Sequence, residues 1–428
     1  MTIRINTVLT RQIIAFGILV VLASQFNARA SGPLWEAITY NNAERAKALV
    51  NLGADVNQKN GYGNPIIHHA VGEGNAEIVE LLIKKGADVN TKGQFDRVAL
   101  HYANKKGIAK ILLANGATVD APTNYGETPL HWAASAVNSL DIQGRVDLVE
   151  FAETLVLHGA DVNKKTGAGR SYRTPLNYAV SSNNLAVAKI LIAHGADVAG
   201  DTSSPLSSIG SDNVEIAQLL IGHGANVNAA TLSGQYPLWA AAAKGQVKVT
   251  GYLLEKGADP NATNGAGLTA LYMAAGSDYN VSTITTLLKS GAKPNVQSTS
   301  GFAAPHQAAQ QNAIKVIELL LANGADVNIA TNSGETPLHR VLMYGKNETM
   351  KDVVEILLKN GANTNAERSS DGRTPFHEAI ARGDIELVKL LMNYGVDLNF
   401  VSKVQGTYLN FARNSKVISE LLRESGAK

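Results

Sequence analysis

The sequence predicts an all-α repeat solenoid of about twelve helix–turn–helix repeats joined by short β-hairpin loops. The string Gly-Ala-Asp-Val-Asn, or a close variant, recurs along the chain at spacings centred on 33 or 34 residues. A period of this length accommodates two short helices and a turn. The copies begin at Gly53, Gly86, Gly116, Gly159, Gly195, Gly224, Gly257, Gly291, Gly324, Gly361 and Gly395, and a shortened copy begins at Gly426.

Each period contains the signals of two consecutive helices. Thr336 and Pro337 begin a predicted first helix, because Thr is a favoured N-cap and Pro is tolerated in the first helical turn. Apolar residues at helical spacing between Val316 and Gly324 predict a second helix, which Gly324 ends with a left-handed C-cap. The Asp-Val-Asn and Ser-Gly segments that follow have the composition of hairpin turns.

These recurring strings closely resemble the ankyrin-repeat family. The best matches to the family's Thr-Pro-Leu-His-x-Ala signature begin at Thr128, Thr336 and Thr374, and weaker ones begin at Thr174 and Ser204. The resemblance covers residues 31–428, with capping repeats near residues 32–57 and 400–428. It implies a protein that binds another protein over a concave surface of first helices and hairpin tips.

Four repeats depart from the regular period. The repeat that ends at Gly116 lacks about one helical turn, and the one that ends at Gly224 has a shortened hairpin, where we expect a bend. The repeat that ends at Gly159 has about ten extra residues between its helices, around residues 136–144. These are either a further partner contact or a tolerated surface loop. The next hairpin is longer, with residues 167–169 at its tip.

The first thirty residues differ from the repeats and predict a signal peptide. Arg4 and Arg11 flank an apolar run from Ile13 to Ala23, and a small-x-small cleavage site ends at Ala30. The run is shorter than the roughly twenty residues that span a bilayer. We therefore expect an exported protein, periplasmic or extracellular, of bacterial source and with no membrane span after cleavage. The alternative is a membrane tether formed by the uncleaved segment.

Charge and cysteine content narrow the possible partners. Removing residues 1–30, which contain three Arg and no acidic residue, changes 38 basic residues to 35 against 36 acidic ones, and the net charge from +2 to −1. Nucleic acid is therefore not an expected partner, because its binding requires a clustered positive face. The chain has no cysteine, so packing alone must stabilise it, and we expect a monomer.

Ten histidines raise the question of a metal or acid–base site, and the repeat accounts for nine of them. Six occupy the histidine of the Thr-Pro-Leu-His string, where the resemblance implies structural hydrogen bonds between repeats: His68, His101, His131, His306, His339 and His377. Three precede the C-capping Gly, where a cation complements the helix dipole: His158, His194 and His223. No zinc-binding, nucleophile or phosphate-loop motif occurs. We therefore expect no catalytic residue, metal or cofactor, and no enzymatic activity.

Three aromatic residues stand at the tips of consecutive predicted hairpins: Tyr62, Phe95 and Tyr125. Exposed aromatic side chains are enriched in binding hot spots, so they predict a partner-binding patch. The alternative is that the rings pack onto adjacent hairpins. The patch is expected to include the polar residues that follow each turn and two lysines at the end of a neighbouring first helix: Asn64, Arg97, Glu127, Lys105 and Lys106.

A second aromatic series follows the histidine position of the signature: His69, Tyr102, Trp132 and Tyr178. Because this position is apolar and buried in proteins of the resembling family, we predict that these rings belong to the core between repeats. Trp239 and Tyr272 replace the histidine itself and are also predicted to be core.

Export, a rigid preformed surface and the absence of catalytic motifs together favour a protein-binding module. An inhibitor or immunity-type protein that covers an exported enzyme or toxin is the expected role. A secreted effector that engages host-cell proteins has the same sequence features, and so does an envelope scaffold.

Overall fold

The computed structural model describes residues 32–135, 142–167, 172–199, 204–231, 234–345 and 349–428. The predicted signal peptide, residues 1–30, and residues 136–141 of the insertion lie outside these ranges. The chain divides into two compact units. Unit 1 comprises Met1–Ser211 and Gln218–Ala225, and unit 2 comprises Asp212–Ala217 and Asn226–Lys428.

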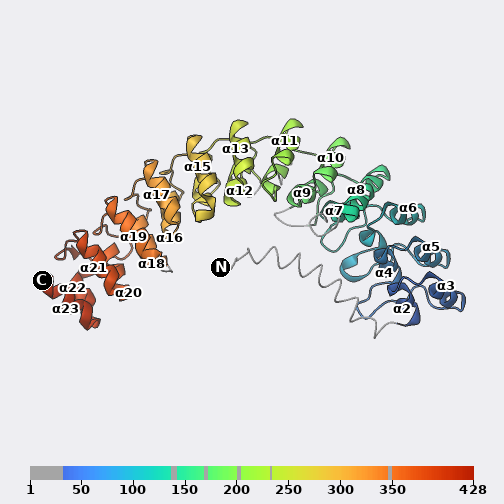
Figure 1. Cartoon of the computed structure of the whole chain (residues 1–428), viewed down its shortest axis with the longest axis horizontal. Helices are drawn as coiled ribbons and strands as arrows, with labels where there is room; N and C mark the ends of the chain where they lie inside the picture. Colours follow the sequence, from blue (N-terminus) through green and yellow to red (C-terminus); the bar gives the residue numbers. More distant parts are fainter. Residues whose placement is uncertain (1–31, 136–141, 168–171, 200–203, 232–233, 346–348) are drawn as a thin grey trace. The chain divides into compact units, whose positions relative to one another are not determined.

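Unit 1 is built from helix pairs whose first helices pack in one row and whose second helices pack in another (Figure 1). Its first-helix row contains α2 (Pro33–Thr39), α4 (Ile66–Glu73), the 3₁₀ helix η2 (Ala99–Tyr102), α7 (Pro129–Ser135), α9 (Pro175–Ser181) and the 3₁₀ helix η3 (Pro205–Ser208). Its second-helix row contains α3 (Ala43–Asn51), α5 (Ala76–Lys84), α6 (Lys106–Ala114), α8 (Ile142–Leu157) and α10 (Leu185–Ala193). A further 3₁₀ turn, η1 (Gln94–Asp96), lies in a hairpin, and α11 (Val214–Gly222) supplies residues to both units.

Unit 2 repeats the same arrangement. Its first helices are α12 (Pro237–Ala243), α14 (Ala270–Ala274), α16 (Ala304–Gln310), α18 (Pro337–Tyr344), α20 (Pro375–Arg382) and α22 (Tyr408–Phe411), which continues into η5 (Ala412–Asn414). Its second helices are α13 (Val247–Glu255), α15 (Val281–Lys289), preceded by η4 (Asp278–Asn280), α17 (Ile314–Ala322), α19 (Met350–Lys359), α21 (Ile385–Asn393) and α23 (Lys416–Glu424). Strands β1 (Val401–Ser402) and β2 (Gly406–Thr407) form an antiparallel hairpin.

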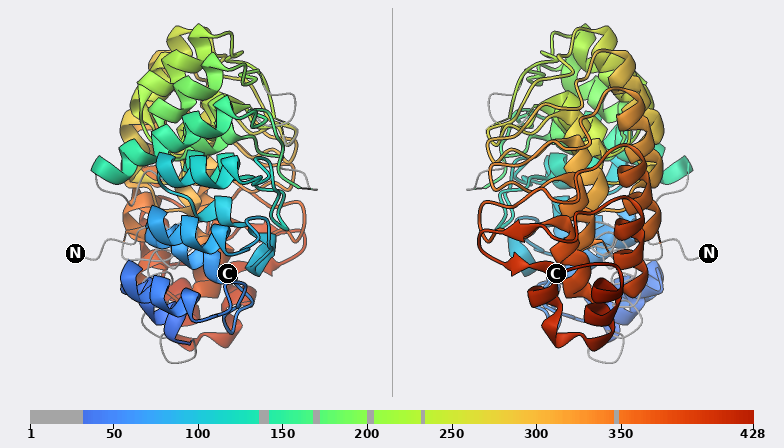
Figure 2. Two further views of the ribbon diagram at one scale, coloured as in Figure 1. Left: turned by 90° about the vertical axis from the view of Figure 1, so that its right-hand side faces the viewer. Right: turned by 90° about the vertical axis from the view of Figure 1, so that its left-hand side faces the viewer.

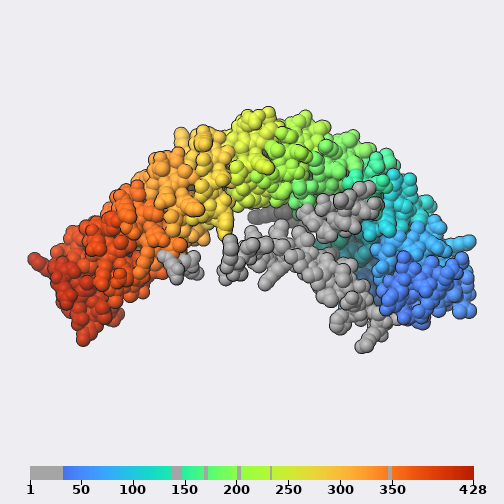
Figure 3. Space-filling view, in the orientation of Figure 1, coloured from blue at the N-terminus to red at the C-terminus, as the bar shows by residue number. Residues whose placement is uncertain are grey.

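The predicted all-α repeat solenoid is confirmed within each unit. In both units the hairpin loops project to one side of the helices (Figure 2), and successive repeats pack against each other in sequence order (Figure 3). Buried apolar residues of the second helices, such as Val316 and Leu320, form the core between the rows. Among the described helices, none has the length and apolar character needed to cross a membrane.

The Thr-Pro-Leu-His string fixes the start of a first helix and joins it to the next repeat. In α18 the Thr336 N–H donates to Nδ1 of His339 at 3.1 Å, and the Thr336 hydroxyl accepts from the His339 N–H at 3.4 Å. Nε2 of the same ring donates to the Arg373 carbonyl of the following hairpin at 3.2 Å. One neutral imidazole therefore caps its own helix and binds its neighbour.

The last Asn of the Gly-Ala-Asp-Val-Asn string provides a second tie between repeats. Nδ2 of Asn295 donates to the Gly324 carbonyl, and its Oδ1 accepts from the Asp326 N–H, both at 2.9 Å. The same pair of bonds is made by Asn90, Asn163, Asn228, Asn261 and Asn328. Ala199 occupies this position in unit 1, and its methyl group can make neither bond.

The irregular repeats differ in the helices as well as in the loops. The turn missing before Gly116 is confirmed, because the 3₁₀ helix η2 replaces the first helix. Before Gly159, part of the extra sequence lengthens α8 to 16 residues. Before Gly224 the first helix is reduced to η3, which sequence reasoning missed. Residues 168–171 and 200–203, in the two hairpins of unusual length, lie outside the described residues, and the expected bend stays a prediction.

Candidate partner-binding surface

Three aromatic side chains stand at consecutive hairpin tips of unit 1, as the sequence predicts. Tyr62, Phe95 and Tyr125 are 62%, 39% and 61% exposed. The rings of Phe95 and Tyr125 lie in contact, with centroids 6.2 Å apart. Tyr62 makes no ring contact among the described residues. The alternative, in which the rings pack onto adjacent hairpins, thus applies only to Phe95 and Tyr125. Both of these rings still keep much of their surface in solvent.

Phe95 differs from the two tyrosines in its backbone. Its φ is +60°, and that of Asp96 is +59°, whereas Tyr62 and Tyr125 precede Gly63 and Gly126, which have the positive φ in those hairpins. A left-handed conformation is costly for a side chain as large as Phe. Hydrogen bonds from the neighbouring hairpins hold it, because the Asn124 N–H donates to the Phe95 carbonyl at 3.0 Å.

Asn64 holds the hairpins together. Its Oδ1 accepts from the Gln94 N–H of the next hairpin at 2.7 Å, and the residue is only partly exposed. Asn64 therefore positions the tip that presents Phe95, and its side-chain oxygen is already used within the chain.

Arg97 joins two rings of the surface. Its guanidinium carbon lies 4.2 Å from the centroid of the Trp132 ring and 5.3 Å from that of Phe95. Both distances are within the range of a cation–π interaction. The stacking fixes a flexible cationic side chain against an aromatic face, which lowers the conformational entropy that it has left to lose on binding.

Glu127 and Arg173 hold the next ring, Tyr178, from two sides. The Tyr178 hydroxyl donates to Oε1 of Glu127 at 2.6 Å, and the Arg173 guanidinium lies 4.4 Å from the ring centroid. Nη2 of Arg173 donates to Oγ of Ser181 at 2.7 Å. Burial raises the pKa of the Tyr178 hydroxyl above its ordinary value, and the hydrogen bond to Glu127 raises it further. The hydroxyl therefore keeps its proton and stays a donor.

We call this group of residues the ring surface: Phe95, Arg97, Tyr125, Glu127, Trp132, Arg173 and Tyr178. Sequence reasoning missed Trp132, Tyr178 and Arg173 as members. Trp132 and Tyr178 pack against the histidine of the preceding repeat, at 6.4 Å from His101 and 5.2 Å from His131, and are partly exposed. Their predicted core role is therefore only partly right. Arg173 follows its hairpin as Arg97 and Glu127 follow theirs, which is the signal that could have found it.

The remaining rings of the predicted core are also half-buried. Tyr102 stacks on His68 with centroids 5.0 Å apart, and His69 stacks on Trp35 at 5.1 Å. Trp239 and Tyr272 are partly exposed. The contacts between repeats are present, but these rings lie at the edge of the core.

Lys105 and Lys106 do not join the ring surface. Lys105 is the N-cap of α6 and Lys106 is its first residue, so both belong to a second helix and not to the end of a first one. Nζ of Lys106 lies 4.0 Å from Oε2 of Glu150 on α8. Because η2 is only four residues long, the second helix begins earlier than the regular period predicts, and the prediction that these lysines end a first helix is wrong.

The histidines have the structural roles that the repeat implies. Burial lowers the pKa of His68, His101 and His131 to about 4, so they are neutral at pH 7. Before the C-capping glycines, Nδ1 of His158 donates to the Thr154 carbonyl at 2.8 Å. His69 shares a hydrogen bond with the Thr39 hydroxyl at 2.8 Å. Among the described residues, no cluster of His, Asp or Glu could hold a metal ion.

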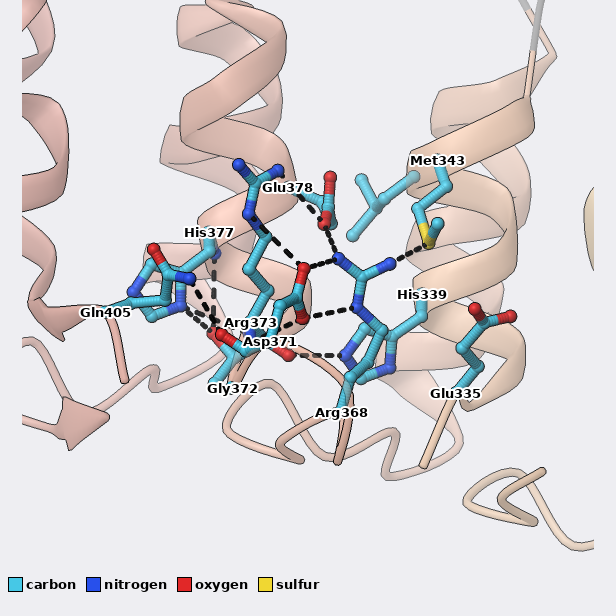
Figure 4. Close-up of polar contacts among 12 residues, drawn as sticks. Glu335, His339, Met343, Arg368, Asp371, Gly372, Arg373, His377, Glu378 and Gln405 are labelled. Carbon is cyan, nitrogen blue, oxygen red and sulfur yellow. Dashed lines mark hydrogen bonds and ion pairs between the residues drawn. The ribbon is translucent and has the colours of Figure 1, made fainter. Parts of the chain in front are cut away.

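Arg340 and Arg368 of unit 2 differ from the stacked arginines of unit 1, because both form close ion pairs with carboxylates, which Figure 4 shows for Arg368. Arg368 is buried and donates from Nη2 to Asp371 and to Glu378, both at 2.7 Å, and from Nη1 to Sδ of Met343 at 2.8 Å. Arg340 binds Glu335 at 2.8 Å. These guanidiniums are paired with carboxylates of their own unit.

Comparison with known proteins agrees with the fold. A family model described as "Ankyrin repeats (3 copies)" matches overlapping stretches that together span residues 14–428. An ankyrin repeat protein of fowlpox virus (strain NVSL), FPV031, is 29% identical over 188 residues, 43% of this chain and 54% of that protein. The human SMC5-SMC6 complex localization factor protein 1 is 34% identical over 93 residues, 22% of this chain and 8% of that protein. The human SH3 and multiple ankyrin repeat domains protein 2 is 31% identical over 155 residues, 36% of this chain and 8% of that protein.

This chain thus spans about half the length of the fowlpox protein and less than a tenth of the two human ones. Ankyrin repeats are protein–protein interaction modules.

Proposed function

We propose that this chain, which belongs to the ankyrin-repeat family, is a non-enzymatic protein that binds a partner protein across the ring surface of unit 1. The observation that supports this proposal is the cluster of four aromatic rings and two stacked arginines on neighbouring hairpins and first helices. Tyr, Trp and Arg are the residues most enriched in binding hot spots.

The surface is preorganised for binding. Tyr178 stands on a helix capped by Thr174, and Trp132 follows His131, whose Nδ1 accepts from the Thr128 N–H at 3.0 Å. Arg97 and Arg173 are stacked on these two rings. Phe95 and Tyr125 add apolar area that is still in contact with solvent. Because little side-chain freedom remains to be lost, most of the energy of the new contacts contributes to affinity.

The experiment is capture of the partner from the compartment that contains the protein, followed by affinity measurements with variants. Phe95→Ser combined with Tyr125→Ser should weaken partner binding by about a hundredfold, because two aromatic anchors are lost. Tyr40→Ser combined with Tyr279→Ser removes two rings that are 69% and 99% exposed elsewhere and serves as the matched control. Unchanged affinity in the first double variant, with a native circular dichroism spectrum, would contradict the proposal.

Export is part of the proposal and rests on the first thirty residues. We expect the mature protein to begin at Ser31 and to fractionate with periplasmic or secreted proteins. Sequencing its N-terminus after cell fractionation tests this, with a variant that has Arg in place of Leu19 as a control for a disrupted apolar run. A protein that keeps Met1 in the membrane fraction would instead be tethered, and recovery inside a host cell would indicate an effector.

An inhibitor or immunity-type role follows if the captured partner is an enzyme or toxin. A rigid protein that covers a large part of its partner's surface blocks access to it sterically. Adding the purified mature protein should then reduce the partner's activity in proportion to complex formed, and full activity in the complex would exclude inhibition.

A further inference from the structure

We infer that the segment of the partner protein that docks on the ring surface is acidic, and that one of its carboxylates binds the guanidinium of Arg173. This inference rests on the proposed function and names the chemistry of the partner. It begins with Arg173, whose guanidinium carbon lies over the Tyr178 ring, 4.4 Å from its centroid. Its Nη2 donates to Ser181 and to the Asn177 carbonyl, which fixes its orientation.

Arg173 forms no ion pair with the described residues of its own unit. Its two hydrogen-bond acceptors are a hydroxyl and a backbone carbonyl, and no carboxylate of the described residues lies within ion-pairing distance of it. The nearby Glu127 accepts the Tyr178 hydroxyl at 2.6 Å. A partly exposed guanidinium with a planar set of donors is suited to bidentate binding of a carboxylate.

In unit 2, arginines that stack on aromatic rings also form ion pairs with carboxylates of the same unit. Arg340 lies 4.9 Å from the ring centroid of Phe302 and 4.3 Å from that of Tyr344, and it also binds Glu335 at 2.8 Å. Arg373 lies 5.2 Å from the ring centroid of Phe411 and 3.7 Å from Oδ2 of Asp371. For Arg173, the counterpart of these carboxylates comes from the partner.

The neighbouring rings define the rest of the segment. Phe95 and Tyr125 are exposed beside Arg97, so an apolar side chain flanked by acidic ones matches the order of groups along the surface. Arg97, stacked on Trp132 at 4.2 Å, adds a second positive charge. Long-range attraction of this kind raises the association rate and makes binding sensitive to salt.

The test uses the full mature chain and a short fluorescent peptide in which Glu and Asp flank a central Phe. Its controls are the same peptide with Gln and Asn, and one with Lys. We expect the acidic peptide to bind at least about tenfold more tightly than the neutral one, and to weaken between about 0.05 M and about 0.5 M salt. Equal affinity for the acidic and neutral peptides would overturn the inference.

Variants locate the binding site. Arg173→Gln should weaken binding of the acidic peptide by about tenfold, because a charge-assisted hydrogen bond is lost. Arg173→Lys keeps the charge without the planar fork and should give an intermediate loss. Arg45→Gln removes a charge of the exposed Arg45–Glu36 pair and should have no effect. Equal affinities of Arg173→Gln and Arg45→Gln, with matching thermal unfolding, would overturn the assignment to Arg173.

Two further outcomes separate this inference from the proposed function. A captured protein whose affinity falls in the Phe95 and Tyr125 variants, but not in Arg173→Gln or at high salt, would refute the acidic segment and leave the protein-binding surface intact. Tighter binding of a single-stranded oligonucleotide or of vesicles with anionic lipid than of the acidic peptide would refute a protein segment as the natural anion.

Discussion

The two units use the same repeat but treat charge in opposite ways. In unit 1, Arg97 and Arg173 lie on the rings of Trp132 and Tyr178 near the surface. In unit 2, the buried Arg368 is surrounded by Asp371 and Glu378. The backbone is alike in both, so the residues next to the signature decide whether a repeat presents a binding surface or a closed network. Arg97 and Arg173 of unit 1 stack on aromatic rings near the surface, whereas Arg340 and Arg368 of unit 2 pair with carboxylates of their own unit.

Acid should destabilise both units, and this is the largest effect that we expect. His68, His101 and His131 in unit 1 and His339 and His377 in unit 2 have their pKa lowered from 6.5 to about 4. Between pH 6.5 and about pH 4 the unfolded chain therefore binds more protons than the folded chain. The free energy of unfolding has its full value above pH 6.5 and falls as the pH decreases to about 4, by about 1.4 kcal/mol per histidine for each pH unit.

Hydrogen exchange followed by mass spectrometry at pH values across this range would measure the loss for each unit. The control is Lys359→Ala, which alters only an exposed pair. Histidine protonation should weaken both units, and a loss confined to one of them would show that the histidines do not act alike.

Arg368→Ala should lower the free energy of unfolding of unit 2 by about 2 kcal/mol. It removes the closer of the two cations of the buried Glu378 carboxylate, at 2.7 Å, and leaves only the longer contact with Arg373 at 3.6 Å, and a poorly compensated buried charge is costly. Urea unfolding monitored by exchange in α20 would measure this. Lys359→Ala breaks an exposed pair with Glu355, which solvent screens, and should have a much smaller effect. Equal losses would mean that the network in Figure 4 is not a buried one in solution.

Gly126→Ala should destabilise unit 1 by about 2 kcal/mol and also weaken partner binding. A Cβ there would lie 2.3 Å from the Gly167 nitrogen, and φ is +78°. The control, Gly53→Ala, has φ +92° with no atom within 4 Å of the added Cβ, so it should cost only about 1 kcal/mol. Thermal unfolding compares the two. A similar loss in both would show that the hairpins of unit 1 can separate.

The smallest expected effect is a gain. Ala199→Asn places an amide where six other repeats have theirs, and restoring the hydrogen bond to the next repeat should stabilise unit 1 by about 0.5 to 1 kcal/mol. Asn295→Ala removes the same ties in unit 2 and should cost a similar amount. Both are read from urea unfolding. No gain at Ala199 would indicate that the short repeat around η3 does not present the carbonyl in the usual place.

Sequence reasoning succeeded where a residue's role is set within its own repeat. The capping by Thr336 and the second role of His339 follow from their positions in the string. It failed for Lys106, because the reduction of a helix to η2 moves the boundary between helices. It also assigned Trp132 and Tyr178 wholly to the core, since a ring that touches the preceding histidine can still have an exposed face.

The sequence by itself determined the helix pairs, their order and the use of most histidines, because helix caps and repeat periods are local properties. Only the tertiary structure decided which side chains meet across repeats. Arg173 meets Tyr178 within its own repeat, whereas Glu127 reaches the same ring from the preceding one, and Arg368 reaches Met343 on the preceding first helix. These contacts depend on the register of one repeat on the next, which packing sets and which no single period encodes.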